Sequence, residues 1–160
     1  MNRRLLLASL ATLSFATVTP TASANFGVAG SVGTGFVRAG GGEFNRFATN
    51  IEIMPFYKIA IVSLDLGIKF NLESLAGQPR DLVFRPGARI SIPVIPLYGR
   101  IAIPLEATND GSYGLLVGLG FNMSLGPVGV FAEANVNLNS KPSFAETFPL
   151  EIRVGAQFSF

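Results

Sequence analysis

Ten charged residues recur at alternate positions of stretches that otherwise have the composition of β-strands. They are the side chains of this sequence best suited to chemistry. Five are acidic and five basic: Glu52, Asp65, Lys69, Arg85, Arg89, Arg100, Glu106, Glu133, Glu151 and Arg153. If the strands bring them to one enclosed face, equal numbers of acids and bases predict ion pairs, because unpaired charge in a narrow space is costly. Such a set is either a structural plug or the gate of a narrow polar conduit, and we favour the plug.

Composition restricts the other chemistry that this chain could perform. It has no Cys and no His, which excludes a disulfide, a nucleophilic cysteine, a histidine base and a Cys/His metal site. A serine with a carboxylate does not readily replace the imidazole base. The glycines at 27, 30, 33 and 35 are followed by no helix that would hold a phosphate, so small residues inside a narrow barrel explain them better. We therefore expect no enzymatic activity, no cofactor and no metal.

The first 24 residues predict export. Arg3 and Arg4 form a basic region, an apolar stretch follows up to residue 18, and Ala22 and Ala24 complete a small-residue cleavage site. We expect a signal peptide over residues 1–24 and one mature domain over residues 25–160. Without those two arginines the chain has 10 basic and 10 acidic residues, so its charge gives no reason to expect a nucleic-acid partner.

The hydropathy of the chain is high for a soluble protein. Charged residues make up 14% of the sequence and the mean hydropathy is +0.45, yet no apolar run after residue 24 is long enough for a membrane helix. In a strand that faces lipid on one side, apolar residues occupy only every second position. High hydropathy without a long apolar run is therefore typical of a membrane barrel.

The last eleven residues show the alternation most strictly. From Leu150 to Phe160 every even position is apolar and every odd position is polar, charged or glycine. Eleven residues are about what a tilted strand needs to cross a membrane.

The same period-2 pattern predicts eight strands, at residues 26–38, 47–54, 62–73, 83–94, 98–107, 113–125, 128–139 and 150–160. Polar loops follow the odd-numbered strands, and tight proline-bearing turns are expected at 54–58, 95–96 and 126–127. An even number lets the last strand pair with the first. We expect an all-β, eight-stranded antiparallel up-and-down transmembrane barrel. A turn at 95–96 would pair Gly87 with Pro104 and Pro86 with Leu105, which predicts a bulge or widened ladder there.

Side-chain size indicates which face lies inside. The polar face carries Gly, Ser and Asn, whereas the apolar face carries Phe, Leu, Ile and Val, and only small side chains suit a narrow lumen. Aromatic residues near both strand ends suggest interface girdles: Phe26, Tyr98 and Phe158 at the turns, and Phe47, Phe84 and Tyr113 at the loops. Inside, we expect Arg89 to lie beside Asp65, and Arg100 and Arg153 to meet Glu133. Glu52 would complete the layer.

The strand count, the alternation of short turns with longer loops, and a closing strand with Phe158 third from the end and a terminal Phe160 resemble the small eight-stranded Gram-negative outer-membrane barrels of the OmpA-barrel and OmpX type. In that family the closing strand is read by the barrel assembly machinery, which implies Phe158 and Phe160 as an assembly signal. The resemblance also implies an outer-membrane location, contact with lipid and lipopolysaccharide, and a monomer. Enzymatic relatives of the deacylase and palmitoyltransferase types imply a catalytic His, which this chain lacks.

The function expected from the sequence is that of a non-enzymatic outer-membrane barrel, structural or binding through its loops, with a lumen plugged by charge. A small passive, porin-like pore for ions or small polar solutes is the first alternative. A soluble periplasmic lipid binder of the lipocalin type is the second.

Overall fold

The computed structural model describes residues 25–38, 44–46, 48–72, 82–106, 113–139 and 148–160, all of them strands and their short connections. The elements are β1 (Asn25–Arg38), β2 (Phe44–Arg46), β3 (Asn50–Ile59), β4 (Val62–Asn71), β5 (Leu82–Ser91), β6 (Leu97–Ala102), β7 (Leu105–Glu106), β8 (Gly114–Leu125), β9 (Val128–Asn139) and β10 (Phe148–Ser159). The predicted signal peptide with its cleavage residues, Phe47 and most of the four longer loops lie outside the described residues. Within the described part, no helix has the length and apolar character needed to span a membrane.

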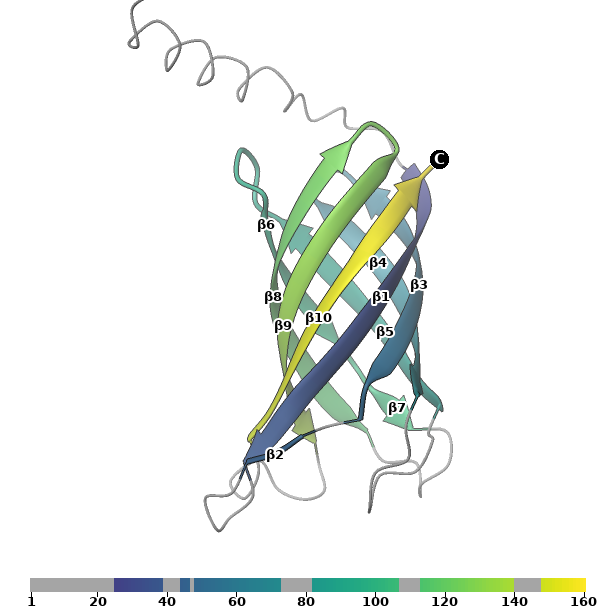
Figure 1. The fold of residues 1–160 in the computed structure, drawn as a ribbon. Helices are drawn as coiled ribbons and strands as arrows, with labels where there is room; N and C mark the ends of the chain where they lie inside the picture. Colours follow the sequence, from purple (N-terminus) through teal and green to yellow (C-terminus); the bar gives the residue numbers. More distant parts are fainter. Residues whose placement is uncertain (1–24, 39–43, 47, 73–81, 107–112, 140–147) are drawn as a thin grey trace, which may run out of the picture.

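The strands form one closed antiparallel barrel (Figure 1). β10 pairs with β1 from Gly27 opposite Ser159 to Arg38 opposite Phe148, which leaves the sheet without an edge. β2 and β3 both pair with β1, and β6 and β7 both pair with β5. Each of these two pairs of elements forms one interrupted strand, so the ten elements make an eight-stranded barrel. The predicted fold class, an eight-stranded antiparallel up-and-down barrel, is confirmed.

The first tight turn lies further along the chain than the sequence suggested. We expected it at 54–58 because of Pro55, but β3 continues to Ile59 and pairs there with Val62. The turn residue Ala60 has a φ of 53°, in the left-handed region. The β3–β4 ladder has no rung at Pro55, and a strand tolerates a residue that lacks an N–H at such a position.

The β5–β6 hairpin has a wider turn than predicted. β5 ends at Ser91 and β6 begins at Leu97, so residues 92–96 form the connection and Gly87 pairs with Ala102 rather than with Pro104. A register shift of two residues does not move a side chain to the other face of the sheet. The wall is interrupted at residues 103–104, between β6 and β7, and opposite this gap the carbonyl of Pro86 accepts the N–H of Ile103 at 2.9 Å.

The two faces of the sheet differ as the residue sizes indicated. Large apolar side chains are exposed on the convex face, where Leu64, Leu119 and Val154 are 53%, 60% and 59% exposed. The concave face carries charged and polar residues, glycines and a few apolar side chains that include Met54 and Leu116. The barrel is therefore apolar outside and mainly polar inside.

Aromatic rings fill the lumen near the turn end by lying against glycines. Phe56 is paired with Gly27, Tyr98 with Gly120, and Phe131 with Gly155, and a Cβ added at any of these glycines would collide with the ring. Tyr98 was expected in an interface girdle, but its side chain points inward and is buried, in line with its spacing of two from Arg100. Each ring takes the space that the glycine on the next strand leaves free.

Other aromatic residues surround both ends of the convex face. Phe160 stacks on Phe26 with ring centroids 6.1 Å apart and meets Phe158 edge-on at 5.0 Å. The Phe160 N–H also donates to the Phe26 carbonyl at 2.8 Å, which ties the last residue to the first strand. At the loop end, Phe84 and Tyr113 are exposed.

The glycine–aromatic pairing predicts that Gly120→Ala destabilises the barrel, because the new methyl group would displace the Tyr98 ring. We expect a loss of about 1–3 kcal/mol, the usual range for overpacking. Gly99→Ala is the matched control, since a Cβ there meets nothing within 4 Å. Urea unfolding in detergent micelles, followed by far-UV circular dichroism because the chain has no Trp, measures both variants. Equal midpoints for the two variants would contradict the packing argument.

Candidate functional site

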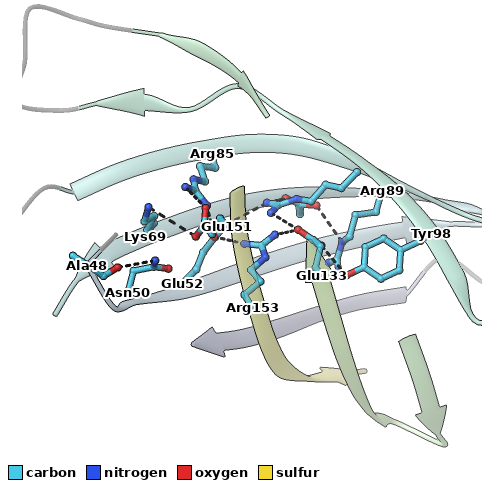
Figure 2. A network of polar contacts seen from close by, with 12 residues as sticks. Ala48, Asn50, Glu52, Lys69, Arg85, Arg89, Tyr98, Glu133, Glu151 and Arg153 are labelled. Carbon is cyan, nitrogen blue, oxygen red and sulfur yellow. Dashed lines mark hydrogen bonds and ion pairs between the residues drawn. The ribbon is translucent and has the colours of Figure 1, made fainter. Parts of the chain in front are cut away.

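The predicted lumen charges project inward from seven strands. Glu52 comes from β3, Asp65 and Lys69 from β4, Arg85 and Arg89 from β5, Arg100 from β6, Glu106 from β7, Glu133 from β9, and Glu151 and Arg153 from β10. Strand alternation places them there, because neighbouring residues of a strand face opposite sides of the sheet. Glu106 is half-buried on β7 toward the loop end. The other nine are joined by hydrogen bonds and ion pairs, most of which Figure 2 shows.

Four of these residues form a closed ring of ion pairs across the lumen. Arg153 binds both Glu52 and Glu133. Arg100 approaches the same two carboxylates from β6, at 3.3 Å from Glu52 and 3.5 Å from Glu133. Each arginine thus bridges the two glutamates, and β3, β6, β9 and β10 are connected through the interior as well as through the wall.

Two branches extend from this ring. Toward the turn end, Arg100 donates to Asp65 at 2.6 Å, and Arg89 donates to the same carboxylate through Nε at 3.2 Å. Toward the loop end, Arg85 bridges Glu52 and Glu151 at 3.0 and 2.9 Å, and Lys69 lies 3.8 Å from Glu151. In these contacts five cations meet four carboxylates along the axis of the barrel, and Glu106 also interacts electrostatically with Lys69.

Burial shows how completely the ring occupies the lumen. Glu52, Arg100 and Arg153 are each only 1% exposed. An arginine head group that makes several charge-assisted hydrogen bonds is held in one geometry, since its planar fork fixes the directions of its donors. At this height the lumen is filled by ion-paired side chains.

Tyr98 is a member of the network that the sequence reasoning missed. Its hydroxyl donates to Glu133 at 2.7 Å, which gives that carboxylate a third partner. Arg89 lies over the Phe56 and Tyr98 rings, with centroid distances of 5.2 and 5.9 Å. Tyr98 is two residues from Arg100 on the same strand, and this spacing could have predicted that its side chain also faces the lumen. Phe56 was missed because Pro55 was taken to end the strand.

The arrangement stabilises buried charge among the described residues. The carboxylates of the ring are all occupied by arginines, and the described residues contain no group of three or more Asp, Glu, His or Cys that could hold a metal ion. What the site can do chemically is to neutralise buried charge at mid-height in the lumen.

Similarity to known proteins was found among solved structures and not among family models or curated proteins. No protein-family model matches the chain, and no curated protein matches it. Among solved structures, neisserial surface protein A (NspA) matches with 14% identity and a TM-score of 0.48, covering 84% of this chain and 97% of that one. The closed eight-stranded architecture seen here is that of the small outer-membrane barrels that the sequence resembles.

The number of partners at each carboxylate predicts an order of effects on stability. Glu52 binds three arginines, whereas Glu151 binds Arg85 and lies near the less buried Lys69. Glu52→Gln keeps the shape but removes the charge, and we expect it to cost about 3 kcal/mol or more, as for a broken buried pair. Glu151→Gln should cost less.

Urea unfolding of both variants in micelles, compared with the wild type, tests this order. A Glu52→Gln midpoint equal to that of the wild type, or a larger loss in Glu151→Gln, would show that the ring does not support the fold.

Proposed function

We propose that this chain is a non-enzymatic integral outer-membrane barrel with a structural role in the envelope, and that its ion-pair network closes the lumen. The observation that carries the proposal is the inverted distribution of polarity. Apolar side chains are exposed around the convex face while Glu52, Arg100 and Arg153 are buried in the interior. Lipid is the solvent that this exterior suits, because closed barrels leave no backbone group unsatisfied in a membrane.

The soluble lipid-binder alternative fits this distribution poorly. A lipocalin-type barrel would need apolar walls around its cavity, but the lumen at mid-height contains ion-paired arginines and carboxylates. The exposed apolar surface would also be a large aggregation hazard in water.

The choice between plug and pore depends on the ring of Glu52, Glu133, Arg100 and Arg153. The near-complete burial of its arginines favours the plug, since an aqueous path along the lumen would wet them. A small pore for ions or polar solutes would require that these pairs separate and that water replaces their hydrogen bonds. Loop-mediated binding rests on segments outside the described residues.

Export and assembly complete the proposal. Cleavage after Ala24 would leave Asn25, where β1 begins, as the first mature residue. Phe158 and Phe160 lie exposed at the end of the closing strand, where the assembly machinery could read them. Lipopolysaccharide and phospholipid would surround a monomeric barrel.

Membrane partition is the direct test of location. Expressed in a Gram-negative host, the chain should sediment with outer-membrane markers and should remain in the membrane after extraction with urea or alkali. Recovery in the soluble periplasmic fraction would contradict an integral barrel and favour the soluble binder.

Conductance tests whether the lumen is closed. In planar bilayers the wild type should carry little current, whereas Arg100→Ala and Arg153→Ala should each raise the single-channel conductance several-fold by removing a fully buried side chain. Leu119→Ala, which removes an exposed side chain, is the control and should match the wild type. Large, steady currents from the wild type would contradict the closed lumen and favour the pore.

A further inference from the structure

The turn end of the lumen contains a pocket that the ion-pair ring does not use. Its volume is about 140 Å³. It lies where the strands meet the tight turns, beyond Arg89 and Tyr98 as seen from the ring. The residues that line it are Asn25, Phe56, Lys58, Ser63, Arg89, Ser91, Tyr98, Asn122, Ser124, Gly126, Gln157 and Ser159.

The charge of this pocket has one sign. Lys58 and Arg89 are its two charged lining residues, and no Asp or Glu lines it. Three of the polar groups on its wall are joined by long hydrogen bonds: Gln157 donates to Ser124, and Ser124 to Asn122, each at 3.5 Å. Their donors are therefore available to a ligand at little cost.

Arg89 gives the pocket a built cationic floor. The residue is 5% exposed, and its Nε is fixed by Asp65 at 3.2 Å. Its Nη2 has no hydrogen-bond partner among the described residues. The guanidinium also lies over the Phe56 and Tyr98 rings.

The charge of Arg89 is only partly neutralised. Its one carboxylate partner, Asp65, also accepts the shorter hydrogen bond of 2.6 Å from Arg100. Glu133, the other nearby acid, is already bound by Arg100, Arg153 and Tyr98. Arg89 lines the pocket, shares its carboxylate with Arg100 and has a buried Nη2 donor without a partner among the described residues. A guanidinium in this state favours a nearby anion.

We propose that this pocket binds a phosphate-type oxyanion, with Arg89 as the buried anchor and Lys58 as the cation at the rim. Ser63 and Ser91 flank Arg89 on the wall and supply hydroxyl donors. The same chemistry could come from free phosphate or from the phosphate of a lipid head group. The site goes beyond the proposed function and is measurable in micelles, whether the lumen is plugged or conducts.

The test is a titration of the whole mature barrel, refolded in an uncharged maltoside detergent, by amide NMR at constant ionic strength. Inorganic phosphate is the first probe and dihexanoyl phosphatidylglycerol the second. Saturable shifts confined to the turn end are expected with at least one of them. Saturable shifts with phosphate alone would identify the free anion as the ligand, and saturable shifts with the lipid alone would identify the head group. The absence of saturable shifts with both probes would overturn the proposal.

Variants locate the site. Arg89→Gln should weaken binding about tenfold or more, the usual effect of losing a charged hydrogen-bond donor. Lys58→Gln should weaken it about two- to fivefold, since the lysine is exposed. Lys69→Gln removes a lumen cation that does not line the pocket, and it should bind like the wild type.

Lys58 also keeps the test decisive if Arg89→Gln fails to fold by circular dichroism. Lys58→Glu, at an exposed position, should then abolish saturable binding while the barrel stays folded. Unchanged affinity in Lys58→Gln and Lys58→Glu, or a loss in Lys69→Gln equal to theirs, would overturn the assignment.

Discussion

The packing of the lumen depends on the ion pairs that the carboxylate of Glu52 makes. This carboxylate receives Arg85, Arg100 and Arg153, three cations from three different strands. Each of the three also contacts a second carboxylate, so Glu52 is the acid that joins their separate pairs into one network. An eight-stranded lumen is only wide enough to be filled by side chains. Here the filling is ionic at mid-height, and a single acid is its hub.

The remaining space is filled by pairing large side chains with glycines. The rings of Phe56, Tyr98 and Phe131 each face a glycine on the neighbouring strand, and Asn135 has the same relation to Gly118. This explains why glycine is frequent on the inward face of a fold in which it usually weakens strands. Its cost in strand stability is offset by the volume that it leaves for its neighbour.

The sequence predicted which side of the sheet each side chain lies on better than it predicted the position of the side chain along the barrel axis. Alternation assigned Arg89 and Glu133 to the lumen and Leu119 to the exterior, because a period of two depends only on neighbouring residues. Turn positions depend on backbone geometry that residue types reflect weakly. Pro55 suggested a turn where the strand continues, and the connection at residues 92–96 moved the β5–β6 register by two. Since that shift is even, no side chain changed face. The expected pairs of Arg89 with Asp65, and of Arg100 and Arg153 with Glu133, are present in the structure. The contacts of Arg85 with Glu52 and Glu151 depend on the shear of the closed barrel, which no local pattern specifies.

The geometry of the network in turn depends on that shear. A buried ion pair adds little net stability compared with apolar residues of similar size, but its geometric demands are strict. Arg100 reaches Glu52 on β3, Asp65 on β4 and Glu133 on β9, and a slip between any of these walls would separate at least one pair. On the exterior, Leu, Ile and Val tolerate such slips, because one exposed apolar side chain suits lipid as well as another. The paired charges are therefore sensitive to the register of the strands, whereas the apolar face is not.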